Sequence, residues 1–430
     1  MSDKAADSAF QPEIVADNGL LHRRLFLTQG VALFGTGGLA LLAARPAGAE
    51  TLTVPTWTKT IGAPMSGYGV PSKYEDKVQR IVRPGAPGSP GTGRSVTPLE
   101  LINGTITPAG LHFERHHNGI PDIDPAQHRL VIHGKVKRPL SFTVDSLLRY
   151  PTVSRIQFLE CSGNSAVGWA REAAQQSVGN LHGLLSCSEW TGVPLSILLD
   201  EAGVEPGAAW VLAEGADSAA LSRSVPLPKA MDDAMVALWQ NGERIRPEQG
   251  YPMRLFLPGF EGNMNVKWLR RLQVNDGPTM TRDETSKYSD LMPDGKAWLF
   301  TYTMGVKSLI TSPSHGFKMQ GPGLYEISGL AWSGAGKIRR VEVSADGGKT
   351  WGEAALTDPV LSKSLTRFRM AWRWNGGPAI LKSRAIDETG AVQPSRDELV
   401  AQRGERSNYH YHGIQPWSIA ATGEVTNVHA

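Results

Sequence analysis

The sequence predicts an α+β domain followed by an immunoglobulin-like β-sandwich. From residue 98 to residue 290, short apolar runs typical of strands alternate with short helical patterns, and this mixture favours the α+β class. From residue 291 to residue 430, short runs of alternating apolar residues follow one another without helical patterns between them. The chain has 430 residues, of which 40% are hydrophobic, so two domains have enough material for ordinary cores.

In the first domain, two kinds of segment are distinguished by their apolar spacing. Residues 130–134 and 253–257 are apolar runs of the length of buried strands. Residues 144–150 and 194–202 favour short helices, the second with leucines spaced along one face.

In the second domain, residues 325–332 and 338–344 alternate with period two, which predicts strands with one buried face. An Asp-Gly-Gly turn at residues 346–348 then predicts a hairpin, because glycines tolerate tight-turn geometry. Residues 368–374 and 379–386 continue the series of strands.

The N-terminal segment has the pattern of a twin-arginine export signal. Arg23 and Arg24 precede a glycine-diluted apolar stretch, and small residues for cleavage follow at 47–49. The alternative is a chance arginine pair before a cytosolic helix. We expect residues 1–49 to stay outside the fold, and residues 50–97, rich in glycine and proline, to form an irregular arm. The signal implies a protein that folds around a cofactor before export to the periplasm, and we expect no other segment to span a membrane.

Charge and cysteine content exclude several classes. The net charge is +3, from 44 basic and 41 acidic residues, without the clustered basic excess of a nucleic-acid-binding protein. The two cysteines, Cys161 and Cys187, are too few for most zinc or iron–sulfur sites. Cys161 ends an apolar run beside Gly163, where a ligand can approach the backbone. Two interpretations remain open: a disulfide with Cys187, or a thiolate for a soft metal whose other ligands come from a cofactor.

Five motifs, in order, resemble those of the sulfite oxidase family of molybdenum enzymes. The resemblance covers the chain from about residue 99 to the C-terminus. The motifs are Phe-Glu-Arg-His-His-Asn-Gly-Ile-Pro at 113–121, Cys-Ser-Gly-Asn at 161–164, Gly-Tyr-Pro-Met-Arg-Leu-Phe-Leu-Pro-Gly at 250–259, Val-Lys-Trp-Leu at 266–269, and the sandwich segments 331–334 and 343–351.

The resemblance implies a molybdenum ion held by one pyranopterin dithiolene (molybdopterin), terminal oxygens and the Cys161 thiolate. Cys187 then becomes a buried small residue that is not a ligand. Arg254 and Lys267 are the expected partners of the pterin phosphate. The implied cofactor-binding residues are Phe113, Arg115, His116, Asp217, Gln249, Arg254, Asn265, Val266 and Lys267. Gln249 stands where the family usually has histidine.

The resemblance also implies catalytic roles for Arg115 and Tyr288. Arg373 matches a sandwich arginine that reaches into the family's site, although a charge on a strand surface explains it equally well. Sulfite-oxidising members have arginines directly after the cysteine motif and a tryptophan further on; this chain has Ser165, Ala166 and Asn180 at those places. We therefore expect a roomier pocket that holds small anions less tightly.

With the tail at residues 408–417, the chain resembles the molybdenum subunits of sulfane dehydrogenases in the bacterial sulfur-oxidising (Sox) system. That resemblance implies a substrate sulfur bound to a cysteine of a carrier protein, electron transfer to a c-type cytochrome subunit, and homodimer or hetero-oligomer contacts through the sandwich. No haem-attachment motif occurs in this chain. The alternatives are a periplasmic sulfite:cytochrome c oxidoreductase and, in another class, a cofactor-free assembly module.

Overall fold

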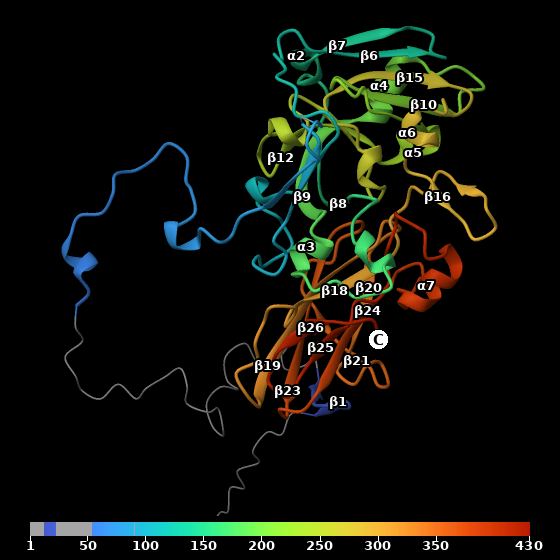
Figure 1. The fold of residues 1–430 in the computed structure, drawn as a ribbon. Helices are drawn as coiled ribbons and strands as arrows, with labels where there is room; N and C mark the ends of the chain where they lie inside the picture. The colour runs from blue at the N-terminus through green and yellow to red at the C-terminus, as the bar shows by residue number, and fades with distance from the viewer. Residues whose placement is uncertain (1–12, 23–53, 90) are drawn as a thin grey trace, which may run out of the picture.

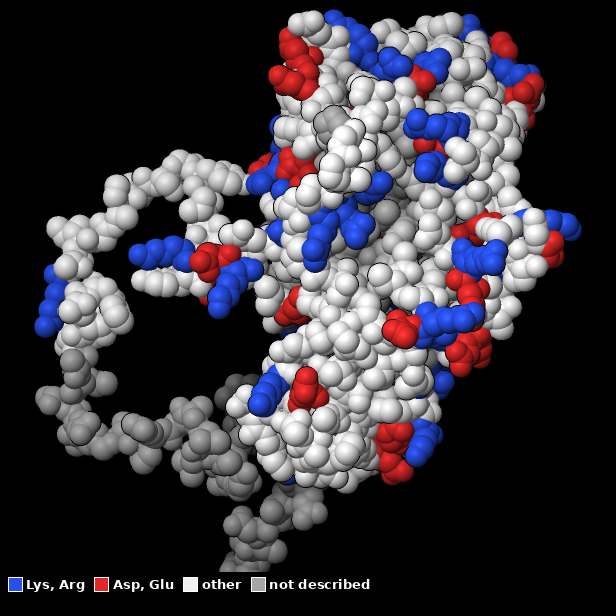
Figure 2. All heavy atoms as spheres, viewed as in Figure 1, with Lys and Arg blue, Asp and Glu red and all other residues white. Residues whose placement is uncertain are grey.

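The computed structural model describes residues 13–22, 54–89 and 91–430. The body has two parts stacked end to end, with the α+β domain above the sandwich in the view of Figure 1. Both parts belong to the predicted classes. Lysine and arginine mix with aspartate and glutamate over the face shown in Figure 2, as expected from the balanced composition.

The α+β domain contains two five-stranded sheets that are mainly antiparallel. The first sheet has the order β11 (Ser222–Pro226), β10 (Trp210–Gly215), β15 (Leu269–Asn275), β6 (Arg129–Gly134) and β7 (Leu140–Thr143), with β15 and β6 parallel. The second contains β13 (Glu243–Arg244), β12 (Met235–Gln240), β9 (Leu185–Pro194) and β8 (Val153–Glu160), with β14 (Arg254–Phe256) also paired to β12.

Short helices fill the space around these sheets. They are α2 (Val144–Leu147), α3 (Val178–His182), α4 (Leu195–Ala202), α5 (Leu227–Asp232) and α6 (Arg282–Thr285). Helix α4 buries Leu195, Leu198 and Leu199 in a core that strands of both sheets share. Burial of each leucine contributes about 1.5–3 kcal/mol, so the leucine spacing that predicts this helix also fixes it in place. The predicted strands at 130–134 and 253–257 correspond to β6 and β14.

The expectation of an irregular arm over residues 50–97 is only partly right. Its described part begins with an extended stretch, 54–80, that holds two short 3-10 helices, η2 (Thr56–Lys59) and η3 (Lys73–Glu75), and loops out from the body in Figure 1. The Tyr68 hydroxyl of this stretch contacts Glu243 of the α+β domain at 3.0 Å. Trp57 in this stretch is 75% exposed. The arm then forms β3 (Ile81–Pro84) and β4 (Gly93–Val96), which join β5 (Glu114–His116) in a three-stranded sheet. This end of the arm is held by backbone pairing of β4 with β5. The strand propensity of its residues alone does not predict that pairing.

The sandwich consists of two facing sheets. One contains β18 (Lys307–Ser312), β19 (Gly323–Trp332), β23 (Thr366–Trp374) and β22 (Ala355–Leu356). The other contains β21 (Gly352–Glu353), β20 (Ile338–Ser344), β24 (Ala379–Asp387), β25 (Trp417–Ile419) and β26 (Val425–Asn427). Two further strands, β16 (Asp290–Leu291) and β17 (Ala297–Trp298), pair with each other. The predicted hairpin after β20 is present, because Val343 pairs with Gly352.

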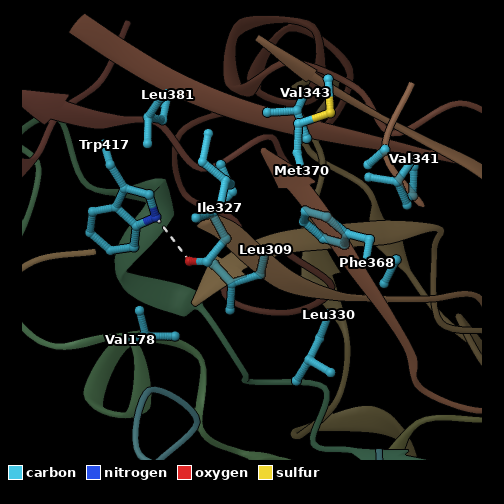
Figure 3. Packing of buried hydrophobic residues seen from close by; sticks show 14 of the residues in the cluster. Val178, Leu309, Ile327, Leu330, Val341, Val343, Phe368, Met370, Leu381 and Trp417 are labelled. Atoms are coloured by element: carbon cyan, nitrogen blue, oxygen red, sulfur yellow. Dashed lines mark hydrogen bonds between the residues drawn. The ribbon is translucent and has the colours of Figure 1, made fainter. Parts of the chain in front are cut away.

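The sandwich core extends into the α+β domain. Figure 3 shows Leu309, Ile327 and Phe368 packed between the sheets, where Trp417 Nε1 donates to the carbonyl of Ile310 at 3.1 Å. Val178 of α3 belongs to the same cluster. The two domains therefore share one continuous core. Helix α7 (Arg396–Arg403), in this half of the chain, was not predicted from the sequence, although a capping box at Ser395 and Glu398 marks its start.

Residues 13–22 contradict the expectation that the whole segment 1–49 stays outside the fold. They form β1 (Ile14–Ala16) and β2 (Leu20–Leu21), which extend the sandwich sheet beyond β23. Arg23 and Arg24 lie outside the described residues. In the described part of the chain, no helix has the length and hydropathy needed to cross a membrane.

Candidate active site

A cavity lies where β8 ends, beside β5 and the loops that follow β10 and β14. It brings together most of the residues that the sequence assigned to a cofactor site: Phe113, Arg115, His116, Cys161, Asp217, Gln249, Arg254, Asn265, Lys267 and Tyr288. The other lining residues are Glu114, His117, Leu159, Leu221, Gly262, Asn263 and Trp268.

Two predicted residues lie elsewhere. The Val266 side chain is buried in the core of the α+β domain, and its backbone carbonyl accepts a hydrogen bond from the Leu255 amide at 2.9 Å. Arg373 is exposed on β23, opposite Leu324. Of the two interpretations of Arg373, the structure supports a charge on the strand surface, so its assignment as a catalytic residue is wrong for this arrangement of the chain.

Cys161 follows β8 directly, in a tight turn closed by a hydrogen bond of 2.8 Å from the Asn164 amide to the Cys161 carbonyl. Its thiol is partly buried and lines the cavity, and Cys187 is buried in β9. Both cysteines are free, so the disulfide interpretation is wrong. Burial raises the pKa of the Cys161 thiol, while the nearby Arg115 acts in the opposite direction. Binding of a metal cation therefore has to displace the thiol proton.

Buried polar groups packed against the turn after Cys161 hold it in place through Glu160 and Ser165. Glu160 accepts hydrogen bonds from Trp332 Nε1 at 2.7 Å and from Asn164 Nδ2 at 2.9 Å. Lys307 Nζ lies 3.4 Å from the Glu160 carboxylate and donates to Ser165 Oγ at 2.6 Å. Because Trp332 and Lys307 belong to the sandwich, that domain helps to position the cysteine turn.

The three positions that distinguish this chain from sulfite-oxidising relatives do not line the cavity. The Ser165 hydroxyl binds Lys307, and Ala166 packs against the cluster that contains Trp169. Asn180, on α3, accepts a hydrogen bond from Arg83 Nη2 at 2.8 Å. These three residues therefore do not form the cavity wall, and the roomier pocket expected from them stays a prediction. Arg115 is the cation that acts most directly on the Cys161 thiol.

One end of the cavity is suited to a phosphate. The Arg254 side chain is buried, stacks over Trp190 at 5.1 Å, and donates to the carbonyls of Gln249 and Asn265 at 2.9 and 2.8 Å. Its Nε atom is buried without a hydrogen-bond partner among the described residues. A buried guanidinium with an unused donor favours an anionic ligand.

Lys267 is the second cation at this end. Its ammonium group lies 3.0 Å from His116 Nδ1 and donates to the Glu248 carbonyl at 3.1 Å. Burial, followed by the repulsion from Arg254, lowers the pKa of Lys267 to about 7. A bound phosphate reverses the second effect and stabilises the ammonium form.

The neighbouring wall is preorganised by a chain of polar contacts. His116 Nε2 lies 2.7 Å from a Glu114 carboxylate oxygen, and Arg80 pairs with the same carboxylate. Burial lowers the pKa of His116, so the neutral ring accepts from Lys267 at Nδ1 and donates to Glu114 at Nε2. Gln249 donates to the Phe113 carbonyl at 2.9 Å, which identifies the partner that the sequence left open.

The end of the cavity near Cys161, which is called the mouth below, is lined by Arg115, His117 and Tyr288. Tyr288 O lies 2.9 Å from His117 Nε2. Burial raises the pKa of Tyr288 and lowers the pKa of His117 to about 4, so at neutral pH the phenol donates to the neutral imidazole. Arg115 donates to the carbonyl of Gly93 at 3.2 Å, which fixes the guanidinium at the mouth.

A buried polar cluster behind Tyr288 was not predicted from the sequence. Arg223 lies 3.2 Å from Glu261 and stacks over the Tyr288 ring at 5.1 Å. His410 Nε2 lies 3.1 Å from the other Glu261 oxygen, and Arg223 also binds the cavity residue Asn263. The available signals were Glu261 and Asn263, just before the predicted cofactor residue Asn265, and the histidines of the tail at 408–417, to which no individual roles were assigned.

The donor set of the cavity fits a molybdopterin group. Arg254 and Lys267 would hold its phosphate, Asp217, Gln249 and His116 its polar edges, and Cys161 the metal. Beyond this single thiol, no group of three or more His, Cys, Asp or Glu side chains in the described residues is placed to hold a metal ion.

Comparison with known proteins agrees with this chemistry. Residues 117–282 match the oxidoreductase molybdopterin binding domain, and residues 299–415 match the Mo-co oxidoreductase dimerisation domain. The chain belongs to the molybdopterin oxidoreductases of the sulfite oxidase family, which are molybdenum-dependent oxidoreductases.

A solved structure gives a more particular similarity. The chain superimposes on the sulfane dehydrogenase SoxCD from Paracoccus pantotrophus with a TM-score of 0.85 and 46% identity, covering 88% of this chain and 97% of that one. NADH nitrate reductases are more distant: the enzyme of Solanum lycopersicum is 33% identical over 320 residues, which is 65% of this chain and 34% of the relative. Nitrate reductase 1 of Arabidopsis thaliana is 31% identical over 71% of this chain and 38% of its own length. This chain spans about a third of the length of these nitrate reductases.

Proposed function

We propose that this chain is the molybdenum subunit of a periplasmic sulfane dehydrogenase, which oxidises a sulfane sulfur carried on a cysteine of a partner protein. The similarity to the sulfane dehydrogenase SoxCD supports this choice over nitrate reduction, because it covers nearly all of that chain. The observation that carries the proposal is the electrostatics of the mouth. Arg115 lines the cavity with Cys161, and the neighbouring His117 and Tyr288 are uncharged and hydrogen-bonded to each other at 2.9 Å, so this end of the cavity is a weak trap for a small dianion such as sulfite.

When bound, the molybdenum cofactor supplies a two-electron oxidation in which the oxygen added to sulfur comes from water. The protein orients the reacting groups and stabilises charge. Arg115 offers a guanidinium to the negative charge that grows on the oxidised sulfur. Tyr288 keeps its proton and donates a hydrogen bond to His117 Nε2, which orients the phenol hydroxyl beside the reacting sulfur. Each oxidation adds one oxygen atom and releases two protons and two electrons, and a separate c-type cytochrome takes the electrons.

The deciding experiment compares substrates on one preparation of the loaded enzyme. Turnover is measured with a carrier-bound persulfide, with sulfite and, using a reduced dye, with nitrate, each with and without a periplasmic cytochrome fraction. We expect cytochrome-dependent turnover of the persulfide and poor turnover of the two anions. Efficient sulfite oxidation would favour the alternative sulfite:cytochrome c oxidoreductase, and a molybdenum assay of the same preparation tests the cofactor-free alternative.

The periplasmic location has its own test. Replacing Arg23 and Arg24 by lysines should leave folded, loaded enzyme in the cytoplasm, measured by activity in the two cell fractions. Normal periplasmic activity of this variant would contradict twin-arginine export. The full purified chain should show no haem absorbance; a Soret band on this polypeptide would contradict the separate cytochrome.

A further inference from the structure

Residues 13–22 bind the sandwich through specific backbone contacts. β2 pairs with β23 at Leu20 and Trp372, at the lower end of the molecule in Figure 1. The Gly19 carbonyl accepts a hydrogen bond of 2.8 Å from the Arg373 amide, and the Asn18 carbonyl accepts one of 2.7 Å from Trp372 Nε1. The hairpin therefore satisfies donors of a strand that would otherwise form an open edge.

A second group of contacts comes from the loop after β20. Asn18 Nδ2 donates to the Ala345 carbonyl at 2.7 Å, and the Asp17 amide donates to Thr350 Oγ1 at 2.9 Å. Thr350 is held by Asp346, to which its hydroxyl donates at 2.6 Å. This loop is organised by its own hydrogen bonds, so it offers the hairpin a preformed partner.

The turn sequence is matched to the surface that it contacts. Asn18 and Gly19 have φ of 60° and 89°, the left-handed geometry that asparagine and glycine adopt most readily. A side chain at position 19 would collide with the carbonyl of Arg373. The Asn-Gly pair therefore serves both the hairpin and its contact with β23.

Apolar side chains complete the contact. Ala16, Leu20 and Leu21 are buried, and Ala16 and Leu20 belong to the same core cluster as Met370 and Trp372. Ile14, on the same hairpin, is 65% exposed. Burial is thus confined to the side of the hairpin that faces the sandwich.

We propose that residues 13–22 are an intramolecular ligand of the folded sandwich, which anchors the export leader to the enzyme and leaves a vacant acceptor site when the leader is removed. This inference rests on the proposed export, because the two arginines of the predicted signal follow His22 in the sequence. The acceptor consists of β23 and the loop at 345–350, which are far from the hairpin in sequence and meet only after the sandwich has folded. The anchor therefore forms only on a folded sandwich.

Hydrogen exchange of the full chain tests the anchor without depending on export. In the unaltered chain, the Arg373 amide should be protected. Leu20→Asp should accelerate its exchange at least tenfold, because a carboxylate cannot occupy the apolar site. Ile14→Asp places the same charge on the exposed side of the hairpin and should leave the exchange unchanged. Equal protection in all three chains, or none in the unaltered one, overturns the proposal.

A peptide experiment tests the acceptor site on the periplasmic enzyme after leader removal. A synthetic peptide of residues 13–22 should bind saturably and slow exchange of the Arg373 amide, whereas the peptide with aspartate at position 20 should not. Absence of binding by the unaltered peptide overturns the acceptor site. If the enzyme never reaches the periplasm but the full chain shows the expected exchange pattern, the export proposal fails and the anchor stands.

Discussion

At the scale of single residues, the two cysteines lie in different surroundings: Cys161 lines the cavity, whereas Cys187 is packed in the core. Substitutions at the two positions therefore distinguish an effect on metal binding from an effect on packing. Cys161→Ser should abolish turnover, because a hydroxyl is a poor substitute for a thiolate toward a soft metal, whereas pterin should remain bound through Arg254 and Lys267. Cys187→Ser is the matched control, because its Sγ lies 3.4 Å from Ser364 Oγ in the core and away from the cavity. Activity, molybdenum content and pterin fluorescence after release are measured on both variants. Near-normal rates in the first variant would exclude Cys161 as a ligand.

Lys267 makes anion binding depend on pH. Its pKa of about 7 in the open cavity means that the ammonium form is lost above neutral pH. A phosphate monoester is already a dianion there, so its affinity for the cofactor-free chain should fall by up to about tenfold per pH unit between pH 7.5 and 9. Binding in this window should take up a proton, which calorimetry in buffers of different ionisation enthalpy measures. Lys267→Arg should flatten the dependence; an unchanged slope would show that another group is responsible.

Protonation of Lys267 favours anion binding but lowers the stability of the cofactor-free fold. The pKa of Lys267 is lower in the folded chain than the ordinary value of 10.5, so the unfolded chain binds more protons between these values. This residue therefore makes the cofactor-free chain more stable as pH rises from about 7 to 10.5. The destabilisation below pH 7 is what a bound phosphate relieves.

At the scale of the elements, loops from the two domains cross at a pair of glycines. Gly334 follows β19, and a Cβ there would collide with the carbonyl of Gly259, which follows β14. Met304 bridges them, donating to Gly259 at 3.0 Å and accepting from Gly334 at 2.9 Å. Gly334→Ala should lower the free energy of unfolding by about 1–3 kcal/mol or more, the usual range for overpacking. Gly277→Ala, where a Cβ meets no atom within 4 Å, is the control and should be near neutral in urea unfolding.

The elements also show what sequence patterns could predict. Regular periodicity located β6, β19, β20 and α4, because burial of one face determines both the pattern and the element. The pairing of β4 with β5 was missed because such short strands carry little periodicity, whereas the start of α7 carries a local signal, the capping box of Ser395 and Glu398, that was not used. Motif order predicted residues that line one cavity, although their roles toward a cofactor stay predictions. Arg373 was misplaced because a strand pattern does not reveal which side chains reach a site in another domain.

At the scale of the whole molecule, the two domains meet in a buried ion pair beneath Cys161. Lys307→Met leaves Glu160 without its cation and should destabilise the chain by about 3–5 kcal/mol, as expected for breaking a buried pair. Lys296→Met removes an exposed lysine from the same half of the chain and should change the free energy of unfolding little. If both variants unfold alike in urea, the pair does not join the domains energetically.

The contact between the domains also means that deleting the sandwich is a poor test of whether the sandwich mediates assembly. The shared core and the Glu160–Lys307 pair mean that the α+β domain loses buried partners when the sandwich is removed. Assembly through the sandwich is therefore better examined on the full chain, by light scattering against its 46.5 kDa mass.

The extended arm gives the enzyme an intrinsic optical reporter. Trp57 is 75% exposed, whereas Trp190, Trp332, Trp372 and Trp417 are fully buried. Iodide in solution therefore quenches the red-shifted emission of Trp57 before that of these buried indoles. Any molecule that covers the arm should lower the quenching constant and shift the emission to shorter wavelength, so partners can be screened by their effect on the native chain without a dye.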